Sequence, residues 1–231
     1  MVSLLPYIMV NKRSFKISAD TLVGILFSIP WLDVLAYVWR SGRKLWHGLA
    51  DEGMYEVLDY ESILELLDDT GQLARFEKQE RVRYLQNNIL AYQDQAWGDG
   101  EILIDYQCSP GTVVDQYRPG RKTYQLISLR EMKERGDVDR FHISWRMRNS
   151  FLRHHEQWET EVRHRTKRLQ IKVIFPETRP PVHIWLQEYM RRRTRPLPHT
   201  MLRQLPDRRW MVSWGMEKPR LYEEYVLKWA W

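Results

Sequence analysis

Hydrophobic and polar positions alternate with a period of two through most of the chain after about residue 55. In 141–147 (FHISWRM), Phe, Ile, Trp and Met share one face, and His, Ser and Arg share the other. The segments 169–175 and 225–231 repeat this alternation. Because successive side chains of a β-strand point to opposite faces, the pattern predicts strands with one buried and one solvated face.

Turn sequences rich in Gly, Pro and Asp separate these segments, among them DDTG (68–71), WGDG (97–100) and LPDR (205–208). Two segments, 82–97 and 181–193, fit either a strand or a helix. The predicted strands are 57–67, 73–85, 101–107, 113–118, 123–130, 140–149, 157–166, 168–175, 200–204, 209–215 and 222–230. We therefore expect residues 54–231 to form a mainly β domain, an antiparallel β-sandwich, immunoglobulin-like or related, of roughly 9–11 strands.

Residues 21–39 (TLVGILFSIPWLDVLAYVW) are the longest apolar run. As a helix, residues 22–39 would extend about 27 Å, slightly less than a hydrocarbon core of about 30 Å. Pro30 and Asp33 oppose insertion, whereas basic residues on both sides and aromatic residues at the C-terminal end favour it. We predict one hydrophobic helix and candidate membrane anchor at 20–40, between an N-terminal flank (1–19) and a linker (41–53). A buried helix of a soluble domain is the alternative.

Cysteine usage bears on the location of the β domain. Cys108 is the only cysteine, so no internal disulfide can form, and the chain contains no Asn-x-Ser/Thr sequon. Both features fit a reducing compartment. We therefore expect a membrane-associated protein with its β domain on the cytoplasmic side, or, if 20–40 is a buried helix, a soluble cytoplasmic protein.

Charge is unevenly distributed along the chain. The net charge is +6, but residues 46–110 carry 14 acidic and 4 basic side chains, whereas residues 151–231 carry 17 basic and 9 acidic ones. This layout predicts that acidic and basic strand faces are neighbours in one fold. Proteins that bind nucleic acid more often present an uncompensated basic face.

Two short segments are strongly basic, RHRTKR (163–168) and RRRTR (191–195). In the first, we expect the arginines to share a strand face with Glu159 and Glu161, which Arg146 and Arg148 of a neighbouring strand would pair with. The second has no acidic residue closer than Glu188. Both segments supply the candidate ligand-binding residues for a phosphate or an acidic partner: Arg163, Arg165, Arg191, Arg192, Arg193 and Arg195.

The sequence contains no recognisable catalytic motif, whether for nucleophilic hydrolysis, phosphate binding or zinc-dependent proteolysis. The carboxylates at 94, 99, 101 and 105 do not have the spacing of an EF-hand loop. His154, His155 and His164 lack the spacing of a known zinc class. We therefore expect no catalytic residue, no metal site and no cofactor.

Two functions of different classes fit these patterns. The first is a non-catalytic interaction or sensor module, tethered to a membrane by its N-terminal helix, that binds a protein partner or a membrane surface through strand faces and loops. The alternative is a soluble basic protein that binds nucleic acid through 163–168 and 191–195. A metal-dependent hydrolase using the Asp99/Glu101 turn is a third, minor hypothesis.

Overall fold

A computed structural model describes residues 53–231 of the chain. The predicted flank, the hydrophobic helix and all of the linker except Gly53 lie outside the described residues. The described part contains one 3-10 helix, η1 (His199–Met201), and 14 strands: β1 (Tyr55–Leu66), β2 (Leu73–Tyr84), β3 (Ile89–Ala96), β4 (Glu101–Ser109), β5 (Thr112–Tyr117), β6 (Thr123–Lys133), β7 (Val138–Arg148), β8 (His155–Glu161), β9 (Arg168–Phe175), β10 (His183–Glu188), β11 (Arg193–Pro196), β12 (Leu202–Gln204), β13 (Trp210–Glu217) and β14 (Glu224–Ala230).

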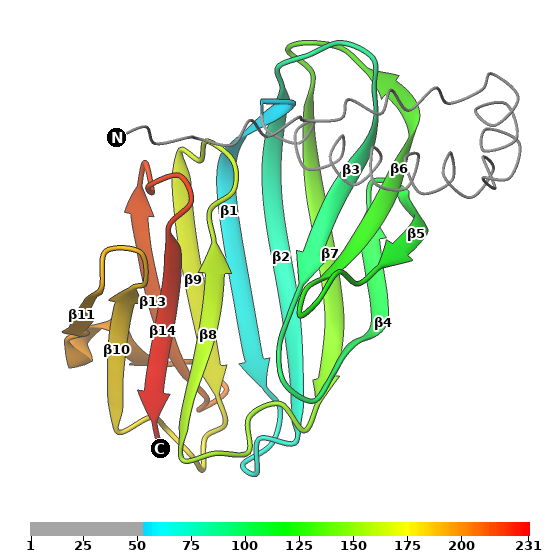
Figure 1. The fold of residues 1–231 in the computed structure, drawn as a ribbon. Helices are drawn as coiled ribbons and strands as arrows, with labels where there is room; N and C mark the ends of the chain where they lie inside the picture. Colours follow the sequence, from blue (N-terminus) through cyan, green and yellow to red (C-terminus); the bar gives the residue numbers. More distant parts are fainter. Residues whose placement is uncertain (1–52) are drawn as a thin grey trace, which may run out of the picture. The chain divides into compact units, whose positions relative to one another are not determined.

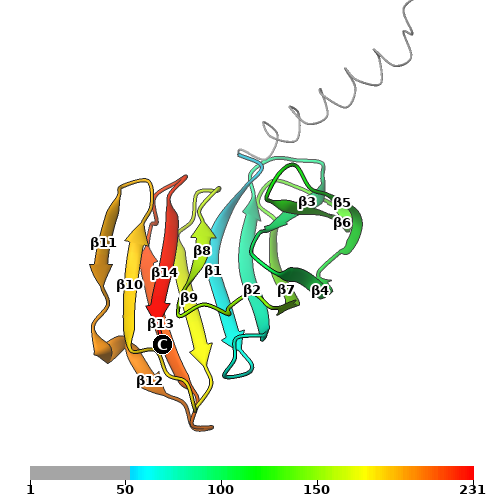
Figure 2. The same cartoon turned by 60° about the horizontal axis from the view of Figure 1, so that its bottom comes forward.

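The strands form three sheets. A seven-stranded sheet has the order β12-β13-β9-β1-β2-β7-β4, a four-stranded sheet the order β11-β10-β14-β8, and a three-stranded sheet the order β3-β6-β5. The two smaller sheets cover the same side of the seven-stranded sheet, with β14 and β8 in front of β13 and β9, and β3 in front of β2 (Figure 1). Figure 2 shows the same two layers from another side. The mainly β fold and the layered packing are as predicted.

Alternation along the strands builds the core between these layers. In β9, the four apolar residues at 169, 171, 173 and 175 are fully buried, and in β7 the residues at 141, 143, 145 and 147 are buried in the same way. Burying one such strand face removes several large apolar side chains from water, each worth roughly 1.5–3 kcal/mol. The two-residue period therefore predicted both the strands and their core-facing sides.

The architecture differs from the prediction in three respects. The sandwich has 14 strands in place of roughly 9–11, because the ambiguous segments contain β3 and β10, and because the arginine-rich β11 is exposed along its whole length and shows no alternation. The antiparallel prediction fails for one pair, since β1 pairs in parallel with β9. The strand expected at 157–166 ends at Glu161, so Arg163 and Arg165 lie in the loop that follows it.

Ion pairs connect the acidic first part of the domain with the basic parts, as the charge layout predicts. Examples are Arg168 with Asp59 (2.6 Å) and Lys172 with Glu61. The expected partners of Arg146 and Arg148 were wrong: these arginines contact Asp105 and Glu101, because β7 lies beside β4 whereas β8 belongs to another sheet. Such half-exposed pairs contribute little individually, up to about 1 kcal/mol each.

No helix between Gly53 and the C-terminus has the length and hydrophobicity of a membrane span. The predicted anchor lies before this part of the chain.

Candidate functional site

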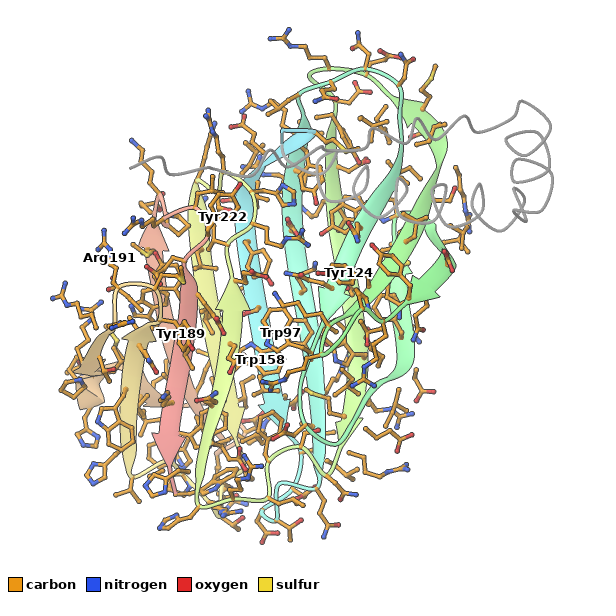
Figure 3. All side chains as sticks on the ribbon, in the orientation of Figure 1. Trp97, Tyr124, Trp158, Tyr189, Arg191 and Tyr222 are labelled. Carbon is orange, nitrogen blue, oxygen red and sulfur yellow. The ribbon has the colours of Figure 1, made fainter. Side chains whose placement is uncertain are left out.

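A cleft separates the two smaller sheets. β3 is hydrogen-bonded only to β6, and β8 only to β14, so the two strands meet as edges without a shared backbone ladder. The deep part of the cleft is a cavity of about 80 Å³ above β1 and β2. A larger part of about 510 Å³ adjoins it, and Trp97, Trp158 and Glu159 line both. Figure 3 shows Trp97 and Trp158 close together between the two sheets. We call this region the β3/β8 cleft.

Side chains on the outer surface bridge the two edges. Trp97 Nε1 donates to Glu159 Oε2 (2.6 Å), and Gln95 Nε2 donates to Glu161 Oε2 (3.0 Å). Lys122 pairs with Glu161 (2.6 Å), and its ammonium lies 4.8 Å from the centre of the Trp97 ring. The two edges are therefore joined by side-chain contacts and not by backbone hydrogen bonds.

The floor of the deep cavity carries a buried charged cluster. Alternation along β2 places Lys78 and Glu80 on the core-facing side. Lys78 Nζ lies 2.5 Å from Asp94 Oδ1, 3.1 Å from the Tyr92 hydroxyl and 3.3 Å from Glu80. Tyr92 donates to Glu80 (2.6 Å), and Tyr106 donates to Asp94 (2.9 Å). One ammonium, two carboxylates and two phenols thus satisfy one another between the seven-stranded and three-stranded sheets.

This cluster fixes the protonation states of its members. Burial alone would lower the pKa of Lys78, but the carboxylates of Asp94 and Glu80 raise it above its usual value. Burial raises the pKa of Tyr92 and of Tyr106, and the carboxylate that each hydroxyl contacts raises it further. Lys78 therefore stays charged and the phenols stay neutral at physiological pH, so the cluster acts as a fixed polar anchor.

The larger part of the cleft combines aromatic walls with charges of both signs. Its aromatic lining is Trp97, Phe151, Trp158, Trp185 and Trp229, and its charged lining is Asp99, Arg121, Arg153, Glu156, Glu159 and Lys228. Within the described residues, the buried indole Nε1 atoms of Trp158 and Trp229 have no hydrogen-bond partner. Buried donors are usually paired, so these two are exceptions.

Glu224 at the start of β14 is sensitive to pH. Burial raises its pKa, and a hydrogen bond with Glu159 and the charge of Glu161 raise it further, to about 7 from an ordinary value of 4.5. The folded state holds the Glu224 proton more tightly than the unfolded state does. The stabilisation from protonated Glu224 is therefore complete below about pH 4.5 and is lost as the pH rises through 7.

We expect Glu224→Gln to remove this pH dependence. Unfolding by urea at about pH 5 and about pH 8 should show a loss of stability in the wild type that the variant lacks, on the order of 1 kcal/mol after allowance for solvent screening. Glu177→Gln, which changes an exposed carboxylate in the β9–β10 loop, is the control and should keep the wild-type profile. An unchanged profile in Glu224→Gln would assign the pH dependence to other groups.

The predicted ligand-binding arginines lie on the β8–β9 loop and on the segment that runs from the turn after β10 into β11. Arg163 lies at the rim of the β3/β8 cleft, where it donates to Gln95 Oε1 (3.1 Å). Arg165 is exposed in the β8–β9 loop. The other four are exposed on the turn after β10 and on β11, at the edge of the four-stranded sheet, and Arg191 pairs there with Glu188 (3.3 Å). These four are Arg191, Arg192, Arg193 and Arg195.

The acidic turn and the thiol have ordinary surroundings. Asp94 belongs to the buried cluster, whereas Asp99 pairs with Arg153 (3.2 Å) and Glu101 with Arg148 (3.2 Å). Between residues 53 and 231 there is no group of three His, Cys, Asp or Glu residues placed to bind a metal ion. Burial raises the pKa of the Cys108 thiol, and the charge of Asp94 raises it further, which makes it a poor nucleophile.

The sequence interpretation missed the cleft and the Lys78 cluster. A signal for the cluster was present, because Lys78 and Glu80 occupy core-facing positions of a strand whose flanking positions, Phe76 and Val82, are apolar. No comparable signal existed for the cleft, whose walls come from segments about 60 residues apart.

Comparisons with known proteins give only weak structural similarity. No protein-family model and no curated protein matches the chain. Among solved structures, a "putative protease" from Parabacteroides distasonis has a TM-score of 0.45 at 10% identity over 77% of this chain and 40% of that one. An M1 zinc metallopeptidase from Deinococcus radiodurans has a TM-score of 0.43 at 7% identity over 75% of this chain and 42% of that one. The chain thus spans about two fifths of either protein, and likeness at this level carries no conclusion about its function.

Proposed function

We propose that the β domain is a non-catalytic interaction module that binds an extended peptide segment of a protein partner in the β3/β8 cleft. The observation that carries this proposal is the meeting of two strand edges, β3 and β8, over a tryptophan-lined cavity of about 510 Å³. Unpaired strand edges readily bind an added strand through backbone hydrogen bonds, and pockets beside them select side chains.

The chemistry of the lining favours a peptide over a purely apolar ligand. The aromatic walls of the larger part, such as Trp97 and Trp158, would pack on the side chains of a bound segment. Charges of both signs around the opening, such as Arg153 and Glu156, would orient a segment that carries charged side chains. The volume is in the range of about 300–1,000 Å³ that is typical of binding pockets.

We also propose that residues 20–40 hold this module at a membrane with the β domain on the cytoplasmic side. The support is the sequence alone: an apolar run of nearly spanning length, basic residues on both sides of it and tryptophans at its C-terminal end. Such a tether would place the cleft near the membrane surface, where it could capture partners.

A peptide-display library selected on the intact protein tests the cleft. Enriched peptides should bind the wild type and lose roughly 30-fold or more in affinity on Trp97→Ala, because central aromatic residues dominate such interfaces. Gly98→Leu should have a similar effect by filling the cleft. Gly98 lines the larger part, and an added Cβ there would meet only Ile102, at 3.5 Å, so the fold should tolerate the change.

Trp210→Ala is the matched control, since this half-buried tryptophan of β13 lines no part of the cleft. It should leave peptide binding unchanged. Peptides that bind Gly98→Leu as tightly as the wild type, or a selection without any enriched peptide, would overturn the proposal.

A further inference from the structure

Three loops meet at the end of the domain where β1 begins. They are the β8–β9 loop (162–167), the turn from β10 into β11 (189–193) and the β13–β14 loop (218–223). Tyr222 N donates to Val162 O (2.7 Å), and Lys218 N donates to Lys167 O (2.7 Å). The Val57 amide of β1 donates to Arg165 O (2.9 Å), so the chain enters the domain beside these loops. We call the three loops the basic end.

The basic end carries a large excess of positive charge. Its only acidic residue is Glu223, which is 0% exposed. Two of its basic side chains have acidic partners outside the loops, Lys167 with Glu56 (3.8 Å) and Arg191 with Glu188 (3.3 Å). The exposed basic residues are seven: Arg165, Lys167, Arg191, Arg192, Arg193, Lys218 and Arg220.

Exposed apolar side chains lie among these cations. Tyr189 is 55% exposed, Met190 65% and Tyr222 49%. Figure 3 marks Tyr222 near the start of β14, Arg191 beside the turn from β10 into β11, and Tyr189 in front of β14, farther along that strand. Large apolar side chains on a highly charged surface cost hydration free energy unless a partner covers them, and a tyrosine suits a boundary that is apolar on one side and wet on the other.

The turn that carries Tyr189 and Met190 is fixed in place. The Tyr189 amide donates to Glu224 O (2.9 Å), and the Met190 amide donates to the buried Glu223 carboxylate (2.7 Å). Arg192 (φ 51°) and Tyr222 (φ 62°) both adopt left-handed backbone conformations, which sharpen the two turns. Docking through these side chains therefore requires little ordering of the backbone.

We propose that the basic end docks on an anionic phospholipid surface, with its arginines and lysines at the headgroup phosphates and Tyr189, Met190 and Tyr222 in the interface. Cations alternating with exposed tyrosine and methionine match the layered chemistry of a membrane surface. The predicted anchor ends 13 residues before Gly53 (53 − 40), so a tethered chain would enter the domain at this end. The inference concerns another surface than the cleft and does not depend on peptide binding.

Flotation of the full-length protein with vesicles tests this docking. Insertion of residues 20–40 needs no anionic lipid, whereas docking of the basic end does. A comparison of phosphatidylcholine vesicles with and without phosphatidylserine therefore separates these two contributions to membrane binding. The wild type should prefer the phosphatidylserine vesicles, and added salt should weaken that preference. The measured quantity is the affinity for phosphatidylserine vesicles relative to that for phosphatidylcholine vesicles. In Arg191→Ala/Arg192→Ala/Arg193→Ala, this preference should fall on the order of 100-fold, since each basic residue near the surface contributes roughly five-fold to the affinity.

The control is Arg118→Ala/Arg203→Ala/Arg208→Ala, which removes the same charge from exposed arginines outside the basic end, on the β5–β6 turn, on β12 and on the β12–β13 turn. It should keep the preference for phosphatidylserine. Equal binding of the wild type to both vesicle types, or an equal loss in both triple variants, would overturn the proposal. Tighter retention of the wild type by a homopolymeric RNA than by phosphatidylserine vesicles at the same salt would also overturn it, and would identify nucleic acid as the partner. If residues 20–40 do not insert but the basic end docks, the protein should bind the phosphatidylserine vesicles and not those of phosphatidylcholine alone.

Discussion

Replacing Lys78 with methionine is expected to destabilise the β domain by about 3–5 kcal/mol. The substitution keeps most of the side-chain volume but leaves Asp94 and Glu80 in the core, at 1% and 4% exposure, without their cation. An uncompensated buried carboxylate must either remain charged in a low-dielectric site or take up a proton, and both cost free energy. Urea unfolding at neutral pH, followed by tryptophan fluorescence, measures the effect.

A charge-neutral variant separates this electrostatic cost from lost packing. Lys78→Met combined with Asp94→Asn and Glu80→Gln should regain much of the lost stability, because no buried charge then lacks a partner. Lys172→Met, which breaks a more exposed ion pair with Glu61, should cost less than about 1 kcal/mol. Similar losses for Lys78→Met and Lys172→Met would show that the buried cluster contributes no more than a surface pair.

The local sequence pattern predicted the strands in which buried apolar side chains alternate with more exposed polar ones. In β7 and β9, every second side chain enters the core, so a two-residue period was sufficient. β11 could not be found in this way, because all four of its residues are exposed and it is defined only by backbone pairing with β10. Its pairing partners are set by the tertiary fold, which local sequence does not encode.

The arrangement of the sheets depends on contacts between distant segments. The parallel pairing of β1 with β9 joins Tyr60 to Leu169, more than 100 residues later, and no turn sequence marks such a connection. The same holds for the cleft, where Trp97 contacts Glu159 from another sheet. The arginine runs were visible in the sequence, but only the fold shows that Lys218 and Arg220 join the 163–167 and 191–193 segments at one end.

The electrostatic layout was predictable because it follows from composition. Strand β1 carries four acidic side chains and no Lys or Arg, and the seven-stranded sheet places it between β2 and β9, whose Arg81 and Arg168 both pair with Asp59. Neighbouring faces of opposite sign then neutralise each other, as between Asp59 and Arg168. The loops of the basic end have no such neighbouring strand, and they carry seven exposed basic side chains and one buried acidic one.

Replacing Trp229 with alanine is expected to cost about 3–5 kcal/mol, because it empties a large volume in the core. Trp229 is 0% exposed, and its ring centre lies 5.8 Å from that of Phe151 and 5.5 Å from that of Phe175. It belongs to β14, which is flanked by β10 and β8 within the four-stranded sheet. Thermal and urea unfolding of Trp229→Ala measure the loss, and Trp185→Ala, a half-buried tryptophan on the neighbouring β10, should cost clearly less.

Trp229→Phe separates the packing of this ring from its hydrogen bonding. Phenylalanine keeps an aromatic ring against its neighbours and removes the indole N–H, which is buried without a partner in residues 53–231. An unpaired buried donor costs about 1–3 kcal/mol, so removing it should offset part of the lost volume and leave Trp229→Phe within about 1 kcal/mol of the wild type. A loss as large as that of Trp229→Ala would mean that removing the N–H brings no compensating gain in stability.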